Sequence, residues 1–390
     1  MIQKKMKLIE NYDVKIFTDN VEDVALEQIM QLLSIDVFSG CKIRIMPDVH
    51  AGAGCVIGFT GNLGDKVIPN IVGVDIGCGI LVQPFKCEQN IDYHAFNEYI
   101  IKAIPVGKNF RGSEHLPLPE KYMPEYREAK QITRSLHCYR DLKNSKRIDK
   151  SIGSLGGGNH FIELNKDESG LLYLAVHTGS RNLGKQVADI YQRLAITSLT
   201  KDGETLLPKP LCYLEGELRD KYLHDMKLCQ RWAILNRKII VGLLMDFLKA
   251  KSYVSKYSED DAFESVHNYI SDDNLIRKGA ISAKLGEKCI IPMNMRDGSL
   301  ICVGKGNDDW NNSAPHGAGR IMSRTKAFEL IDIKDFEESM VGIYSETISE
   351  RTKDESPMVY KPAQEIKDNI SETVSILNTI KPIFNFKAAE

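Results

Sequence analysis

Short apolar runs that end beside glycine and a potentially reactive side chain recur along this chain of 390 residues. Three segments show the pattern clearly: CKIRIMPDVHAGAGCVIGF, VIPNIVGVDIGCGILVQPF and LLYLAVHTGSRNLG. Apolar runs of this length, bounded by glycine, predict buried β-strands that deliver polar side chains at their ends. Periodic apolar positions predict helices over 21–34 and 227–250, and a third after the glycine loop at 179–184. We therefore predict an α/β protein of the α+β type with a central mixed β-sheet.

The composition contains no break that would separate domains, so we predict a single large domain over 1–390. Apolar residues make up 43% of the chain and charged residues 27%, which is typical of a globular protein with a sizeable core. The net charge of −2 excludes a polycation, so any nucleic-acid site must be a local basic patch. The strongest patch is 126–150, where eight lysines and arginines face three acidic residues. Charge alone leaves two interpretations open, a solvated surface or a contact with a phosphate backbone.

The sequence predicts a cytoplasmic protein that has no membrane partner. The densest apolar run, 239–245, is far shorter than the roughly 20 residues of a membrane span. The segment MIQKKMKLIENYD has no apolar stretch of the kind that a secretory signal requires. Nine scattered cysteines without a CxxC pair indicate free thiols in a reducing compartment.

Four histidines lie next to glycines in similar local sequences: His50, His160, His177 and His316. Asp75 and Cys78 share one glycine-rich turn. A lone histidine at a strand end usually has only a structural role. Core packing, however, does not require a glycine near each of four such histidines, so the repeated pattern favours a functional site. Thiolate, imidazole and carboxylate together suit zinc, manganese, iron or cobalt better than magnesium alone. Because a thiolate can bridge two cations, the pattern predicts a site for one or two divalent metals.

The segment GSRNLGKQ at 179–186 is close to a P-loop but lacks its last residue. Gln186 replaces the serine or threonine that binds magnesium in a P-loop, and His177 occupies the preceding strand end. The sequence therefore argues against a Walker-type ATPase. Arg181 and the backbone amides of this loop can still bind a phosphate group.

Six segments, taken together and in order, resemble the RtcB family of RNA-splicing ligases. They are MPDVHAG, VGVDIGCG, GSLGGGNHFIE, AVHTGSRNLG, VHNYI and SAPHGAGR. The matching region runs from Met46 to Arg324, with a further match near the C-terminal end, and covers nearly the whole chain. The resemblance implies an RtcB-like fold whose β-sheet core surrounds a dinuclear metal cleft. It also implies a ligase that uses GTP and manganese to join RNA 2′,3′-cyclic phosphate or 3′-phosphate ends to 5′-hydroxyl ends.

The resemblance implies a set of metal ligands in this sequence. Cys78 would bridge two Mn²⁺ ions, with Asp75 and His160 completing the coordination of one. His177 and His267 would complete the coordination of the other. His267 could not have been chosen from the sequence pattern alone, because no glycine flanks it.

The resemblance also implies a nucleophile and a set of nucleotide contacts. His316 would attack the α-phosphorus of GTP and carry GMP as a phosphoramidate. The implied GTP contacts are Asn159, Glu163, Lys387, Arg181, Arg320 and Arg324, of which Glu163 and Lys387 would hold the guanine. Asp48 and His50 would line the wall of the active site near the RNA end. Two departures from the family pattern are the segment AGAGCVIG after MPDVH and the three residues that follow Lys387.

Three functional hypotheses follow from these residues. The first is the GTP-dependent RNA ligase, for which 126–150 is the candidate RNA-contacting surface. The second is a two-metal phosphoesterase that hydrolyses RNA cyclic phosphates without joining ends and needs no His316. The third is a non-catalytic RNA-binding relative, which would not need the complete set of ligands. The expected partners of the ligase are RNA with these ends, GTP and, optionally, an accessory activator protein.

Overall fold

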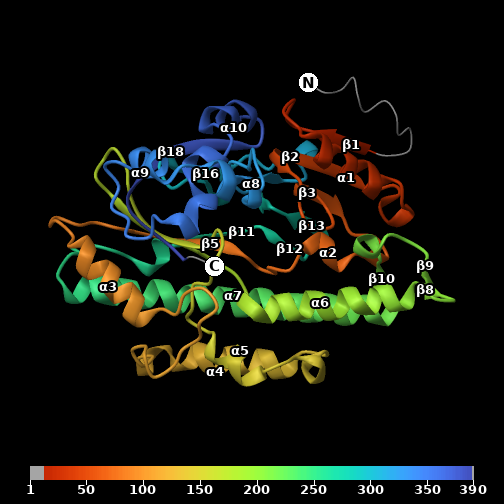
Figure 1. Cartoon of the computed structure of the whole chain (residues 1–390), viewed down its shortest axis with the longest axis horizontal. Coiled ribbons are helices and arrows are strands. Elements are labelled where there is room, and N and C mark those ends of the chain that lie inside the picture. The colour runs from red at the N-terminus through yellow and green to blue at the C-terminus, as the bar shows by residue number, and fades with distance from the viewer. Residues whose placement is uncertain (1–12, 389–390) are drawn as a thin grey trace.

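Two β-sheets form one side of the molecule, and a layer of long helices covers them on the other side (Figure 1). The computed structural model describes residues 13–388. The five-stranded sheet has the order β1 (Asp13–Ile16), β2 (Lys42–His50), β3 (Ile57–Asn62), β13 (Leu275–Lys278) and β12 (Asn268–Ile270). Its pair β1–β2 is parallel and its other pairs are antiparallel, so the sheet is mixed.

The seven-stranded sheet is antiparallel throughout and carries the buried centre of the protein. Its order is β11 (Phe263–Val266), β5 (Gly79–Phe85), β7 (Leu172–Thr178), β6 (Phe161–Lys166), β18 (Val374–Lys387), β16 (Gly298–Gly304) and β15 (Lys288–Asn294). The two edge strands contact each other, and the backbone N–H of Ile290 donates to Ser265 Oγ at 3.0 Å. The sheet therefore curves almost into a barrel. Every residue of β7, an interior strand of this sheet, is buried.

The helices lie in two layers below the sheets in Figure 1. The inner layer contains α3 (Tyr93–Ala103), α6 (Arg181–Ser198) and α7 (Gly216–Ala250). The outer layer contains α4 (Met123–Ser135) and α5 (Ser145–Lys150), and α4 packs on α7. The short helix α2 (Pro69–Val72) contacts α6 and lies between the helix layer and the five-stranded sheet. The remaining helices are α1 (Asp23–Leu33), α8 (Arg324–Leu330), α9 (Ile333–Ser339) and α10 (Ala363–Asn369).

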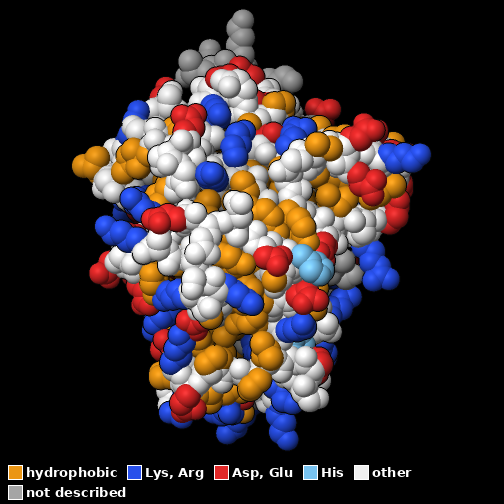
Figure 2. Space-filling view, turned by 90° about the vertical axis from the view of Figure 1, so that its left-hand side faces the viewer, with side chains coloured by type: hydrophobic (Ala, Val, Ile, Leu, Met, Phe, Trp, Pro, Cys, Tyr) orange, Lys and Arg blue, Asp and Glu red, His pale blue; other side chains and the backbone are white. Residues whose placement is uncertain are grey.

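Three short two-stranded sheets complete the fold. They pair β4 (Lys66–Val67) with β10 (Leu214–Glu215), β8 (Thr200–Lys201) with β9 (Glu204–Thr205), and β14 (Ala280–Ser282) with β17 (Ser313–Pro315). Within residues 13–388 no helix has both the length and the apolar composition needed to cross a membrane. The face in Figure 2 shows basic and acidic side chains interspersed among apolar ones, as expected for a nearly neutral chain.

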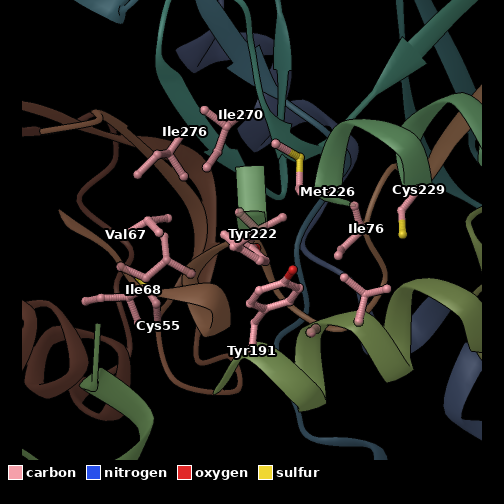
Figure 3. Packing of buried hydrophobic residues seen from close by; sticks show 14 of the residues in the cluster. Cys55, Val67, Ile68, Ile76, Tyr191, Tyr222, Met226, Cys229, Ile270 and Ile276 are labelled. Atoms are coloured by element: carbon pink, nitrogen blue, oxygen red, sulfur yellow. The ribbon is translucent and has the colours of Figure 1, made fainter. Parts of the chain in front are cut away.

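One apolar cluster joins the helix layer to the five-stranded sheet (Figure 3). Tyr191 of α6 and Tyr222 and Met226 of α7 point towards Ile270 and Ile276 of the sheet. The cluster includes residues from Ala25 to Ile276, which lie far apart in the sequence. Elements that share one core fold together, so the molecule is one large α/β domain.

The predicted class and most of the predicted elements are confirmed. Helix α7 starts at Gly216 rather than at residue 227. Its first turns were not predicted because they are largely exposed and polar and so lack the apolar period; they include a Glu217–Lys221 ion pair. The prediction of a buried strand in VIPNIVGVDIGCGILVQPF is wrong for residues 69–72. These residues form the short helix α2, which begins at Pro69 and is followed by Gly73 with φ of 88°. Proline is favoured in the first helical turn and glycine at such an end, which explains the difference.

We predict that Met226→Ala lowers the free energy of unfolding by about 2–5 kcal/mol, because it leaves a cavity in the cluster of Figure 3. Met30→Ala is the matched control, since Met30 is 44% exposed on another helix. The control should change stability by less than about 0.5 kcal/mol. Urea denaturation measures both variants, and equal losses would contradict the assignment of Met226 to the core.

Candidate metal centre and active site

The predicted metal ligands meet at one edge of the seven-stranded sheet. Cys78 comes directly before β5, His160 directly before β6, and His177 lies near the end of β7. β7 runs antiparallel to both β5 and β6, so the end of β7 lies beside the starts of the other two strands. At this edge Gly79 pairs with Thr178, and Phe161 pairs with His177. Asp75 lies in the turn before Cys78, and His267 lies between β11 and β12.

The donor atoms form two groups that share the sulfur of Cys78. One group contains Asp75, Cys78 and His160, and the other contains Cys78, His177 and His267. The Cys78 Sγ lies 3.2 Å from His177 Nε2 and 3.5 Å from His160 Nε2. His160 Nε2 lies 3.0 Å from Asp75 Oδ2, and the Nε2 atoms of His177 and His267 are 3.4 Å apart. The grouping matches the division that the resemblance implied for two metals.

Backbone carbonyls set the orientation of two of these imidazoles. His160 Nδ1 donates to the carbonyl of Leu155 at 2.9 Å, and His177 Nδ1 donates to that of Asn159 at 3.2 Å. The lone pair of each neutral ring is then on Nε2, directed at the sulfur and at the other donors. Histidines that bind metal through one ring nitrogen typically donate a hydrogen bond from the other in this way. The residues present therefore fit a pair of divalent cations held by imidazole, thiolate and carboxylate.

Glycine permits the close approach of side chains at two positions in this site. A Cβ on Gly179 would lie 2.1 Å from Asp75 Oδ1. Gly156 has φ of 98°, and a Cβ there would lie 2.7 Å from His160 Nδ1. Gly179, which follows His177 in the sequence, and Gly156, which precedes His160, are thus required by the packing of the site.

Burial disfavours charge on most of the donors when no cation is present. It raises the pKa of the Cys78 thiol well above its ordinary value and lowers the pKa of His177 and of His267 well below theirs. Burial opposes ionisation of Asp75 as well, but when His160 is protonated its charge and its hydrogen bond lower the pKa of this carboxyl overall. A divalent cation reverses the effect for the thiol, because it stabilises the thiolate directly.

His316 follows β17 and lies beside the metal-ligand group. Its ring centroid is 4.9 Å from that of His267, which in turn is 5.1 Å from that of His177. The fully buried Asp48 accepts hydrogen bonds from His316 Nδ1 at 2.6 Å and from the backbone N–H of His316 at 3.1 Å. The carboxylate oxygen makes Nδ1 the donor, so the lone pair of neutral His316 is on Nε2. The resemblance implied only a wall position for Asp48, and nothing in the sequence indicated its contact with His316.

A cavity of about 690 Å³ adjoins the candidate metal ligands and His316. His50 also lines this cavity, and its Nδ1 lies 2.9 Å from the carbonyl oxygen of Asp48. The same cavity is lined by five of the predicted nucleotide contacts: Asn159, Glu163, Arg320, Arg324 and Lys387. Arg181 lies elsewhere, on the wall of a second cavity, where its Nε donates to Ser154 Oγ at 2.9 Å.

The predicted guanine contacts lie on neighbouring strands of the seven-stranded sheet. Glu163 on β6 pairs in register with Asn385 on β18, and Lys387 lies two residues further along β18. Glu163 accepts a hydrogen bond from Asn385 Nδ2 at 2.6 Å. Burial raises the pKa of Glu163, although the nearby Lys387 opposes this shift.

Glu355 holds the cationic side of this cavity together and was missed in the sequence analysis. Its carboxylate lies 2.6 Å from Lys387 Nζ, 3.1 Å from Arg324 Nη1 and 3.3 Å from Arg320 Nη1. It is buried, yet these cations lower its pKa to about 2. The segment TKDESPMVY has neither glycine nor histidine, so no pattern in it distinguished this carboxylate from a surface residue.

These features define a mixed α/β protein with a thiolate-centred candidate site for two metals beside a carboxylate-oriented histidine. The family model described as tRNA-splicing ligase RtcB matches residues 28–388. The chain is 31% identical over 402 residues to the RNA-splicing ligase RtcB of Escherichia coli (strain K12), with 96% of this chain and 97% of that protein covered. It is 24% identical over 445 residues to the tRNA-splicing ligase RtcB of Pyrobaculum aerophilum, with 93% and 91% covered. The chain belongs to the RtcB family, which confirms the resemblance seen in its motifs.

We predict that Glu355→Gln lowers the free energy of unfolding by about 3 kcal/mol at pH 7, from the shift between the ordinary carboxyl pKa of 4.5 and about 2. Because the pKa of Glu355 is lower in the folded state than in the unfolded state, its ionisation stabilises the folded protein. This contribution to the free energy of unfolding is fully present above pH 4.5 and is lost as the pH falls towards 2. The difference between wild type and variant should therefore shrink between pH 5 and pH 3 in urea denaturation. Glu350→Gln, at an exposed residue of the same short helix, is the control and should show no such trend. A constant difference across this range would contradict the ion-pair interpretation.

Proposed function

We propose that this protein is an RNA ligase that joins 3′-phosphate or 2′,3′-cyclic phosphate ends to 5′-hydroxyl ends, with GTP as cosubstrate and two Mn²⁺ ions. The observation that carries the proposal is the position of His316. Asp48 orients its ring so that Nε2 is the nucleophilic atom, and the ring lies next to His267 of the candidate metal ligands. Membership of the RtcB family supports the same reaction.

Asp75, Cys78, His160, His177 and His267 would hold the two metal ions, with Cys78 shared between them. When bound, such ions neutralise phosphate charge that would repel a nucleophile and stabilise the charge that develops on phosphorus. The protein's own contribution is to fix the imidazoles by their Nδ1 hydrogen bonds, so that no reorganisation is needed when a metal binds.

In the first covalent step, His316 Nε2 attacks the α-phosphorus of GTP. A nitrogen–phosphorus bond forms, the bond to the β-phosphate oxygen breaks, and pyrophosphate leaves. Asp48 holds the Nδ1 proton throughout and stabilises the positive charge that develops on the ring. Arg320 and Arg324 line the same cavity and can donate to the phosphates.

In the second step, an oxygen of the RNA 3′-phosphate attacks the phosphorus of the bound GMP. His316 leaves with its electron pair restored, and the RNA carries an RNA(3′)pp(5′)G end. The RNA 5′-hydroxyl then attacks the 3′-phosphorus, loses its proton and expels GMP as the new phosphodiester forms. A cyclic phosphate must first be opened by water to give the 3′-phosphate.

Guanine recognition is assigned to Glu163 and Lys387. A carboxylate accepts hydrogen bonds from the N1–H and N2–H groups of guanine, and an ammonium donates to O6, which is the pattern that adenine lacks. Both side chains line the cavity that contains His316. Asn159 lines it as well and is assigned to the nucleotide phosphate.

We predict that radiolabelled GTP with Mn²⁺ labels the wild-type protein and that His316→Ala abolishes the label. The linkage should be acid-labile and alkali-stable, as expected of a phosphoramidate. His94→Ala replaces an exposed histidine and should label as wild type does. If His316→Ala still became labelled, the nucleophile would be another residue. If His316→Ala joined no ends but still hydrolysed RNA cyclic phosphates, the metal centre would function independently of His316. If the wild type hydrolysed cyclic phosphates but was never labelled, the phosphoesterase hypothesis would be favoured.

We predict that Cys78→Ala loses both manganese ions, because its sulfur is common to both ligand groups. Metal analysis of purified protein after incubation with Mn²⁺ should give two ions per wild-type chain and close to none in the variant. Cys41→Ala, at a partly exposed free thiol, should keep two ions. Retention of one ion by Cys78→Ala would show that the sulfur serves a single metal.

A further inference from the structure

A second group of candidate metal ligands lies in the helix layers, away from the candidate metal centre. It consists of His137, His224 and Asp225, each of which offers one donor atom within 4.8 Å of the others. His137 lies in the turn between α4 and the short 3₁₀ helix Tyr139–Asp141, whereas His224 and Asp225 are consecutive residues of α7. The group therefore spans the junction between the outer and inner helix layers (Figure 1).

This group is separate from the candidate metal centre. Helix α7 contacts the ligand-bearing edge of the sheet through Arg237, whose Nη1 donates to the carbonyls of Gly77 and Thr178 at 2.8 and 2.6 Å. Asp225 lies twelve residues before Arg237 in the same helix, which corresponds to about 18 Å along the helix axis at 1.5 Å per residue. None of the three residues of the group lines either of the cavities described above.

The carboxylate of Asp225 is fully buried and is held in place by hydrogen bonds. Its Oδ1 accepts from the backbone N–H of His137 at 2.8 Å, and its Oδ2 accepts from the backbone N–H of Cys138 at 3.0 Å and from the hydroxyl of Tyr191 at 2.8 Å. Among residues 13–388, no lysine or arginine forms an ion pair with this carboxylate. The hydrogen bonds offset part of the cost of burying its charge, and a bound cation would offset more of it.

The two imidazoles lie against each other at the surface beside this carboxylate. The ring centroids of His137 and His224 are 4.6 Å apart, and His224 Nδ1 lies 3.0 Å from Asp225 Oδ1. The same nitrogen–oxygen distance separates His160 Nε2 from Asp75 Oδ2 in the candidate metal centre. Both histidines of the surface group are exposed, so a metal ion can reach them without any opening of the fold.

We propose that His137, His224 and Asp225 form a third metal site, which binds Zn²⁺ and fastens the turn after α4 to α7. Two imidazoles and a carboxylate are ligands that zinc prefers, and three protein ligands leave one position for water. Mn²⁺ binds such nitrogen-containing sites more weakly than Zn²⁺ does, so this site is assigned to a metal other than the Mn²⁺ of the proposed reaction. The turn lies within the basic segment 126–150, whose contact with RNA stays a prediction.

The test counts the Zn²⁺ ions bound per chain by metal analysis of the full-length protein. His137→Ala and His224→Ala should each bind one ion fewer than their parent, both in the wild type and in the Cys78→Ala protein, because the site is independent of the candidate metal centre. Both replaced histidines are exposed, so the variants should fold. His94→Ala is the matched control, since His94 Nδ1 also lies 2.8 Å from a carboxylate, that of Glu346, but has no second imidazole as partner. The control should bind as many ions as its parent.

Amide hydrogen exchange locates the ion. In the Cys78→Ala protein, Zn²⁺ at ten times its Kd should slow exchange in the segment 136–141 about 10-fold wherever exchange requires the site to open. Adding His224→Ala should abolish this protection.

Unchanged Zn²⁺ content in both histidine variants would overturn the inference, even if their stability fell, because His224 and Asp225 would then form only an ion pair. Loss of an ion from the His94 control, or protection that avoids 136–141, would overturn it as well. The labelling of His316 by GTP with Mn²⁺ does not involve this site, so either result leaves the proposed function to be tested separately.

Discussion

The approach of several imidazoles to one buried sulfur is the constraint on which the rest of this structure depends. Cys78, His160 and His177 converge because β5, β6 and β7 are antiparallel neighbours whose relevant ends share one edge of the sheet. Their donor atoms lie 3.2–3.5 Å apart, so a proton or a cation must lie between them to prevent repulsion between lone pairs. The surrounding fold holds them in place through carbonyl hydrogen bonds and through glycines that admit neighbouring side chains.

Two buried carboxylates organise the groups around this centre. Asp48 holds the imidazole of His316, and Glu355 gathers Lys387, Arg320 and Arg324 on one wall of the first cavity. Burying a carboxylate is costly unless charges and hydrogen bonds compensate it. Here the compensating groups are themselves the predicted nucleotide contacts, so the stability of this region and its chemistry depend on the same ion pairs.

Much of this arrangement could be predicted from the sequence, because glycine-flanked reactive residues form a local pattern. The strand ends at His160 and His177 and the turn of Asp75 and Cys78 were predicted in this way, and the structure brings them together. His267 required the family resemblance, since its surroundings in the sequence are ordinary. Glu355 and the partnership of Asp48 with His316 could not be predicted, because both depend on contacts between segments far apart in the chain. Helix α2 was not predicted because a short apolar run is equally consistent with a buried strand and with a buried helical turn.

The position of β18 in the seven-stranded sheet has a consequence for biosynthesis. This strand lies between β6 and β16, and it carries Lys387 into the first cavity. Until the ribosome has released residues 374–387, β6 and β16 lack the strand that lies between them, and the first cavity lacks the side chain of Lys387. A nascent chain can therefore bring Cys78, His160 and His177 together on β5, β6 and β7 early, but it completes the first cavity only after its last strand has joined the sheet.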